Sequence, residues 1–208
     1  MRSARHALLG IALLAAGSAH AAGIGARIGT TGLGADVAWD VAPTLSARLG
    51  YSGGSVDYNT DTSAVNYDGK VKLSNFNTFL DFAPLGPLFR ITGGFVFNDN
   101  KYDVVGTPKA GTGISVSGTV KPDKSAAPYL GIGYGRVSGA GVNFYADLGV
   151  MFQGSPVASL TANCGAQTGT PACTAAQSQV AAEQQRLQDE LKNFKYYPVL
   201  NIGLTIGF

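Results

Sequence analysis

Histidine is nearly absent from this 208-residue chain, and the two that occur, His6 and His20, both lie within the first 21 residues. Charge is also scarce, at 13% of the residues, and it is nearly balanced, with 15 Lys and Arg against 13 Asp and Glu. The lack of a basic excess leaves no electrostatic footprint for nucleic-acid binding. No run of 18 apolar residues follows residue 21, so a membrane could be crossed only by strands.

The first 21 residues have the features of a secretory signal peptide. Arg2, Arg5 and His6 precede the apolar run from Ala7 to Ala16, and small residues end this segment at Ala21. We therefore expect a signal peptide over residues 1–21, cleavage after Ala21 and one domain over residues 22–208. No cysteine lies near the expected cleavage point, which argues against a lipoprotein.

The end of the chain alternates strictly between two faces. One face carries Leu200, Ile202, Leu204, Ile206 and Phe208, and the other carries Val199, Asn201, Gly203, Thr205 and Gly207. A strand with large apolar residues on one side and mostly small residues on the other is expected where lipid lies outside and a crowded lumen lies inside.

The same period of two predicts eight strands, an even number as a bacterial barrel requires. They are expected over residues 24–29, 34–41, 45–52, 75–82, 89–98, 128–135, 142–153 and 196–208. Tight turns are expected at residues 42–44, 83–87 and 138–141, and loops at 30–32, 53–70, 99–125 and 154–195. The fold class is thus all-β, an eight-stranded antiparallel transmembrane β-barrel. A soluble lipocalin-like or sandwich fold is the alternative, but it does not explain why phenylalanine gathers on one face and glycine on the other.

The strand that ends at Phe208 resembles the C-terminal signal strand of bacterial outer-membrane β-barrels, and the chain resembles the eight-stranded barrels of the OmpA/OmpX/OmpW type. This resemblance implies an outer-membrane location among lipid and lipopolysaccharide. It also implies that the barrel-assembly machinery reads an assembly signal formed by Leu200, Ile202, Leu204, Ile206 and Phe208. Such families imply three roles: membrane integrity with surface interaction, passage of small hydrophobic compounds, or lipid-modifying catalysis.

The lack of histidine after residue 21 argues against catalysis. The barrel enzymes of such families rely on a catalytic histidine as base or water activator. A Ser–Lys or Asp–Asp site is the remaining enzymatic alternative, but no pattern in the sequence brings such groups together. We therefore expect no enzyme, no cofactor and no metal, and an extracellular ligand that the sequence does not identify.

Seven charged residues are expected to face the lumen: Arg27, Asp36, Asp40, Arg48, Asp81, Arg90 and Asp147. Buried charges must be paired, so we expect a salt-bridged network. If Ala83 opposes Leu88, then Phe82 opposes Phe89 and Asp81 lies directly opposite Arg90. The network is either a polar filling of a largely closed lumen, consistent with a structural or surface-interaction role, or part of a narrow channel for small hydrophobic or polar solutes.

The last expected loop holds the only two cysteines, Cys164 and Cys173. In an oxidising compartment they are expected to form a disulfide; metal binding is the weaker alternative, because other ligands are lacking. From residue 174 to 195 the period becomes helical, with an apolar face of Val180, Leu187, Leu191 and Phe194. This short amphipathic helix either packs on the barrel rim or contacts a partner or lipopolysaccharide.

Overall fold

The computed structural model describes residues 21–86, 88–111 and 113–208, so that residues 1–20 of the expected signal peptide lie outside the described part. Its strands are β1 (Ala22–Gly29), β2 (Gly32–Ala42), β3 (Leu45–Asp61), β4 (Val65–Phe82), β5 (Phe89–Asn98), β6 (Lys101–Pro108), β7 (Ser115–Lys121), β8 (Ala126–Gly135), β9 (Gly141–Phe152), β10 (Val157–Asn163) and β11 (Tyr196–Gly207). Its helices are the short 3-10 segment η2 (Gly165–Gln167) and α2 (Pro171–Leu191). Among the described residues, no helix is both long and apolar enough to cross a membrane.

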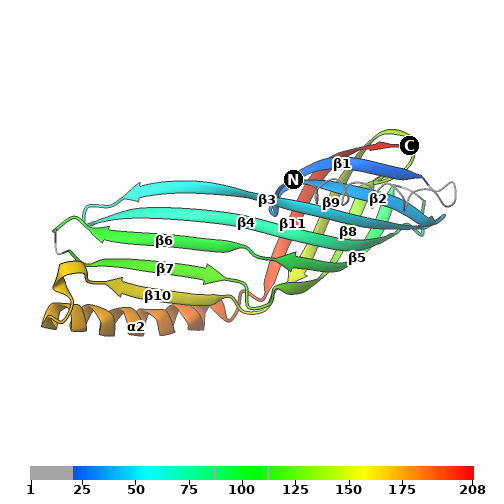
Figure 1. Ribbon diagram of the computed structural model, residues 1–208. Coiled ribbons are helices and arrows are strands. Elements are labelled where there is room, and N and C mark those ends of the chain that lie inside the picture. The colour runs from blue at the N-terminus through cyan, green and yellow to red at the C-terminus, as the bar shows by residue number, and fades with distance from the viewer. Residues whose placement is uncertain (1–20, 87, 112) are drawn as a thin grey trace, which may run out of the picture.

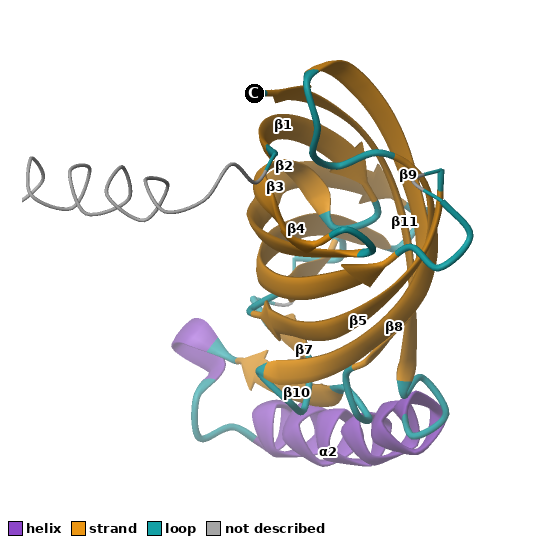
Figure 2. Cartoon of the chain, turned by 90° about the vertical axis from the view of Figure 1, so that its right-hand side faces the viewer, coloured by secondary structure: helices purple, strands orange, loops and turns teal. Residues whose placement is uncertain are grey.

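Eight strands close into a ring of antiparallel pairs (Figures 1 and 2). The order around it is β4, β3, β2, β1, β11, β9, β8 and β5, and the β5–β4 pairing completes the circle. The predicted eight-stranded antiparallel barrel is therefore confirmed. Closure leaves no free strand edge within the ring.

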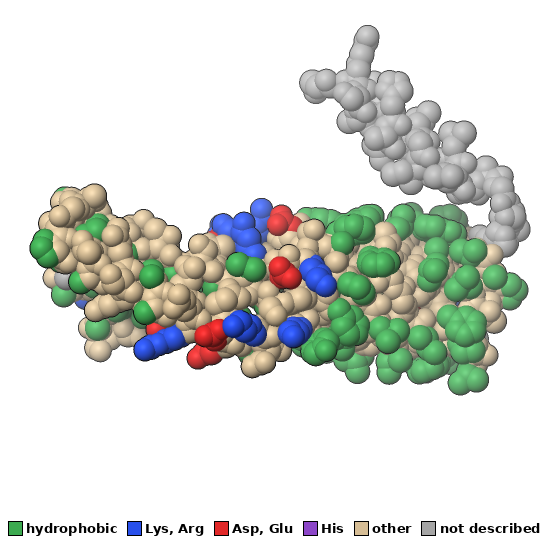
Figure 3. Space-filling model, turned by 90° about the horizontal axis from the view of Figure 1, so that it is seen from below, with side chains coloured by type: hydrophobic (Ala, Val, Ile, Leu, Met, Phe, Trp, Pro, Cys, Tyr) green, Lys and Arg blue, Asp and Glu red, His purple; other side chains and the backbone are tan. Residues whose placement is uncertain are grey.

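Apolar residues cover the outside of the ring because each strand alternates. Along β11, Leu200, Ile202, Leu204 and Ile206 are 47–65% exposed, whereas Val199, Asn201 and Thr205 are at most 3% exposed. Figure 3 shows hydrophobic side chains over the barrel half of the molecule, with Lys, Arg, Asp and Glu gathered next to this band. This pattern, with apolar residues outside and polar or small residues inside, is typical of transmembrane β-barrels.

Three of the four expected loops contain strands, so that part of the prediction was wrong. β3 and β4 continue far beyond the ring as strands of 17 and 18 residues. β6 pairs with β4, β7 pairs with β6, and β10 pairs with β7. These five strands form an open sheet projecting from one side of the barrel, here called the extension (Figure 1). Residues 30–32 do form a tight turn.

The register predicted between β4 and β5 was also wrong, by two residues. Phe82 lies opposite Ile91 rather than Phe89, and Asp81 lies opposite Thr92 rather than Arg90. β4 ends at Phe82 and β5 begins at Phe89, so the connection is longer than the four residues assumed in the prediction. Because the shift is even, every side chain still faces the predicted side.

Helix α2 begins earlier and ends earlier than predicted. Thr170 caps it by accepting a hydrogen bond from the Cys173 N–H (3.3 Å), and Pro171 occupies the first turn, where no N–H is needed. Phe194, predicted on the apolar face, lies beyond the last helical residue and is 61% exposed. Cys164 and Cys173 form a disulfide that ties the start of α2 to the end of β10.

Candidate functional site

Glycine on the lumen face makes room for large side chains from neighbouring strands. A Cβ atom at Gly133 would lie 2.5 Å from Cζ of Arg90, and one at Gly203 would meet the Tyr145 ring. The Tyr129 ring and hydroxyl cover Gly131 and Gly149 in the same way. The glycine-rich face seen in the sequence therefore accompanies a filled lumen.

Two arginines and two aspartates form a quartet inside the barrel. Arg48 contacts Asp147 (Nη1–Oδ2, 2.7 Å) and Asp81 (Nε–Oδ2, 3.1 Å), while Arg90 contacts Asp81 (Nε–Oδ1, 3.2 Å) and also Asp147. All four side chains are at most 3% exposed. Each charge touches both opposite charges, so the quartet is neutral and mutually compensated.

A second ion pair lies on the β1–β2 side of the lumen. Arg27 contacts Asp36 (Nη1–Oδ1, 3.0 Å) and donates hydrogen bonds to Ser52 Oγ (3.2 Å) and to Asn77 Oδ1. Both charged side chains are at most 2% exposed. This pair is also neutral.

Tyr145 links the ion pair to the quartet. Its hydroxyl donates to Asp36, and its ring lies 5.4 Å from Cζ of both Arg48 and Arg90. Arg48 also lies 5.2 Å from the centre of the Phe79 ring. Aromatic faces thus add cation–π contacts to guanidinium groups that water does not reach.

An apolar layer covers the quartet toward the extension. Phe79 stacks on Tyr129 with ring centres 4.6 Å apart, and these rings pack with Val96, Ala127, Met151 and Val199. Along β4, β5 and β9, these residues lie between the charged residues and the mouth of the barrel. The layer separates the buried charges from the outside.

Amide side chains lie at the mouth of the barrel and hydrogen-bond across it. Asn75 Nδ2 donates to Thr31 O (3.2 Å) and to Asn100 Oδ1 (3.0 Å). On the other side, Asn98 Nδ2 donates to Gln153 Oε1 (3.4 Å). These groups are at most 9% exposed and form a hydrogen-bonded rim at the mouth of the barrel, here called the amide rim.

The polarity of the strands inverts where they leave the ring. The inner face of the extension is apolar, with rows Val56, Val71, Tyr102, Val120, Ala158 and Tyr58, Gly69, Val104, Gly118, Leu160. Its outer face is polar, as in the row Asp57, Lys70, Asp103, Thr119, Ser159. Along β4, this inner face continues the lumen face of Asn75, Asn77 and Phe79, and the outer face continues the apolar face of Phe76 and Leu80.

Ion pairs on the outer face are exposed, unlike those in the lumen. Lys70 contacts Asp57 (3.3 Å) and Lys101 contacts Asp103 (2.8 Å). The hydrogen bond from Lys101 is the main cause that lowers the pKa of Asp103, and a hydrogen bond from Thr119 adds to it. Pairs so exposed contribute little to stability.

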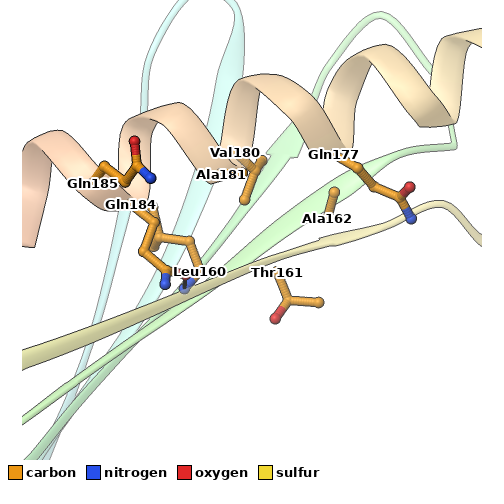
Figure 4. A pocket seen from close by; sticks show the side chains of 8 residues that line it. All are labelled: Leu160, Thr161, Ala162, Gln177, Val180, Ala181, Gln184 and Gln185. Atoms are coloured by element: carbon orange, nitrogen blue, oxygen red, sulfur yellow. Dashed lines mark hydrogen bonds between the residues drawn. The ribbon is translucent and has the colours of Figure 1, made fainter.

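Helix α2 covers the free edge of β10 (Figure 4). The N–H groups of Ala158 and Leu160 donate to Gln188 Oε1 (3.0 Å) and Gln184 Oε1 (2.8 Å), and Gln188 Nε2 donates to Pro156 O (2.9 Å). Gln184 and Gln188 are four helical residues apart, a rise of about 6 Å. Ala158 and Leu160 are two strand residues apart, about 6.6 Å, so the two glutamines can each reach one of these N–H groups. The two glutamines thus take the place of a neighbouring strand. Beyond them a groove of about 370 Å³ opens beside Ala162.

No protein-family model matches the chain, and no curated protein sequence matches it. Its structure is similar to that of Acinetobacter baumannii CarO2, with a TM-score of 0.63 and 23% identity over 90% of this chain and 98% of that one. It is also similar to A. baumannii CarO, with a TM-score of 0.58 and 21% identity over 89% of this chain and 97% of that one. The structure of a major outer membrane protein from Thermus thermophilus matches with a TM-score of 0.45 and 17% identity over 92% of this chain and 100% of that one.

The chain has the fold of a small outer-membrane β-barrel. Within this barrel, six of the seven expected lumen charges meet in the quartet and the ion pair. Asp40 does not: it accepts hydrogen bonds from Ser46 Oγ (2.7 Å) and Ser138 Oγ near the end of β2, and it is only partly buried. Asp40 stands four residues beyond Asp36, near the end of β2 and opposite Ser46, so it lies beside the turn rather than among the arginines.

Sequence reasoning missed the apolar layer, the amide rim and the two glutamines of α2. Phe79, Tyr129 and Met151 stand at lumen-facing positions of their strands. The alternation of the strands could therefore have predicted an apolar layer inside the barrel. Gln184 and Gln188 are four residues apart on one helical face, but only the structure shows that this face meets a strand edge.

Proposed function

We propose that this protein is an integral outer-membrane β-barrel with a closed lumen, whose extracellular sheet serves a structural or surface-interaction role. The observation that carries the proposal is the filled lumen. The quartet, the apolar layer and the amide rim follow one another along the barrel, and nearly all of their side chains are buried.

The outer surface supports a location in lipid. The assembly residues Leu200, Ile202, Leu204, Ile206 and Phe208 all lie on the outside and are 47–70% exposed. Phe76 and Phe97 lie on the same outer surface with their ring centres 5.9 Å apart, near the end of the apolar band. Cleavage after Ala21 would leave Ala22, the first residue of β1, at the N-terminus.

Opening the lumen would require the quartet to separate. Each arginine and each aspartate has two opposite charges as partners, and loss of one partner leaves an uncompensated buried charge at a cost of roughly 3–5 kcal/mol. This cost supports a permanently closed barrel over a gated channel.

The extension supports the surface role. Its inner face exposes Val56 (65%), Tyr58 (46%) and Tyr67 (38%) on a sheet one layer thick. Aromatic residues that keep a polar end are suited to contacts with other molecules. The barrel itself offers no comparable surface, because its outer face is the one proposed to lie in lipid.

Conductance in planar bilayers tests the closed lumen. Wild-type protein should give no current steps. The variant Asp81→Ala/Arg90→Ala/Phe79→Ala/Asn75→Ala should give measurable ones, because it removes side chains from the quartet, the apolar layer and the amide rim together. Asp57→Ala/Lys70→Ala, an exposed pair in the extension, is the matched control and should behave as wild type. Steady conductance from the wild-type barrel would favour the alternative function, a narrow channel for small hydrophobic or polar solutes.

A further inference from the structure

Three lysines stand side by side on the outer face of the extension. Lys72 on β4 lies directly opposite Lys101 on β6, and the pairing of Tyr102 with Val120 places Lys121 of β7 next to Lys101. All three face the same side as the outward phenylalanines of the ring, because side chains alternate along a strand. Lys72, Lys101 and Lys121 are here called the lysine row.

The lysine row lies next to the apolar band of the barrel. Along β4, Lys72 is four residues from Phe76 on the same face, which is about 13 Å along the strand. In an embedded barrel this distance leads from the aromatic boundary of the hydrocarbon into the headgroup region. Lysine stems are long and flexible enough to position their ammonium groups along such a boundary.

The charges of the lysine row are only partly compensated within the chain. Lys101 contacts Asp103 (2.8 Å), which belongs to the next row away from the barrel. Among the ion pairs of the described residues, Lys72 and Lys121 have no carboxylate within 4.0 Å. Asp99, in the connection between β5 and β6, is exposed. Like charges placed opposite one another destabilise a sheet, so an anionic partner would offset a cost that is present in the free protein.

We propose that the lysine row binds the phosphate groups of lipopolysaccharide in the outer leaflet. The proposal rests on the proposed outer-membrane location. Phosphate on lipid A lies at the depth that the lysine row would occupy, and lysine binds phosphate as a point charge. The extension would then be held to the membrane surface by its outer face, leaving its inner face free.

Lipid A binding by the full-length barrel in detergent, measured by native mass spectrometry, tests this proposal. Wild-type protein should retain bisphosphorylated lipid A in preference to dephosphorylated lipid A, and the preference should weaken as salt is raised. Lys72→Gln/Lys101→Gln/Lys121→Gln should lower the affinity on the order of 100-fold, since each lysine near an anionic surface contributes about 1 kcal/mol. Lys109→Gln/Arg136→Gln/Arg186→Gln removes three positive charges elsewhere and should retain wild-type affinity.

Three results would overturn the assignment. Equal wild-type binding of the two lipids would exclude phosphate recognition, and this comparison needs no variant. Equal loss in both triple variants would show a general charge effect. Competition by millimolar inorganic phosphate would indicate a site for free phosphate instead. Heat-modifiable migration and membrane fractionation, measured separately, show whether the proposed location fails; an intact outer-membrane barrel without lipid A preference would contradict only the lysine proposal.

Discussion

The ring and the extension are built partly from the same two strands, β3 and β4, yet their apolar residues face opposite sides of the sheet. Inside the ring, Arg48 and Asp81 are almost completely buried and apolar residues face outward. In the extension, Val56 and Val71 line the inner face and Lys70 faces outward. A strand fixes only the alternation of side chains; the surrounding medium decides which set can face which way.

This comparison also separates two kinds of ion pair. The lumen pairs lie where water is excluded and an unpaired charge is costly, whereas Lys70 and Asp57 are more than half exposed. Replacing Asp, Arg or Lys in an ion pair should therefore change the free energy of unfolding strongly in the ring and weakly in the extension.

Breaking the quartet should have the largest effect. Asp81→Ala or Arg90→Ala alone should lower the free energy of unfolding by roughly 3–5 kcal/mol, because each leaves a buried charge without one of its partners. The double variant leaves the neutral pair Arg48 and Asp147 and should recover part of the loss. Denaturant unfolding in lipid vesicles measures this, with Asp57→Ala/Lys70→Ala expected within about 1 kcal/mol of wild type. Strictly additive effects in the ring would argue against coupling.

Filling a lumen glycine should have the next largest effect. Gly133→Ala should destabilise the barrel by about 1–3 kcal/mol, because the new methyl group would lie against the Arg90 guanidinium, which the quartet holds in place. Gly93 is the matched control on an adjacent strand, since a Cβ there meets no atom within 4 Å. The same unfolding assay compares the two, and equal tolerance of both changes would mean that the lumen is not tightly filled.

Removing the glutamines of α2 should affect the extension and leave the ring unchanged. Gln184→Leu/Gln188→Leu leaves the N–H groups of Ala158 and Leu160 unpaired, at a cost of about 1–2 kcal/mol for the edge. Hydrogen exchange should show roughly tenfold faster exchange of these two amides, with no change for amides in β9. The exposed Gln185→Leu is the control. Unchanged protection in the double variant would show that α2 does not cap the edge.

The smallest effect concerns pH. The hydrogen bond from Lys101 lowers the pKa of Asp103 in the folded protein below its ordinary value of 3.8. The contact therefore stabilises the folded protein above pH 3.8. This stability is lost as the pH falls through the lowered pKa of the folded state. An NMR titration of the Asp103 carboxyl should show this lowered pKa, and Lys101→Gln should move it back toward 3.8. A titration that is identical in both proteins would exclude Lys101 as the cause.

The sequence predicted the ring far better than the extension, for a physical reason. In the ring, strict alternation and the glycine-rich face of β11 point to lipid outside and a crowded lumen inside. In the extension the alternation of Val56, Asp57 and Tyr58 was equally present, but its polarity is reversed relative to the barrel. The predicted strands therefore end too early, because the residues beyond the ring no longer place their apolar side chains on the lipid-facing side.

The candidate site was predictable in composition but not in detail. Six of the charges meet because period two places them all inside. Which arginine meets which aspartate depends on register, and the register between β4 and β5 differs by two residues from the predicted one. A contact between distant elements, such as that of Gln184 with Leu160, cannot be predicted from the amino-acid sequence of either element alone.

Cysteine accessibility along β4 most directly tests whether the ring has a closed lumen and a lipid-covered outer face, in contrast to the extension. Single cysteines would replace adjacent residues in each region, Lys70 and Val71 in the extension and Asn77 and Thr78 in the ring, and intact cells would be treated with a membrane-impermeant maleimide. The native cysteines form a disulfide and do not react. Labelling is expected at Lys70→Cys and Val71→Cys, because the extension is one layer thick. No labelling is expected at Asn77→Cys or Thr78→Cys. Labelling at Asn77→Cys would contradict the closed lumen, and labelling at Thr78→Cys would contradict a ring surrounded by lipid.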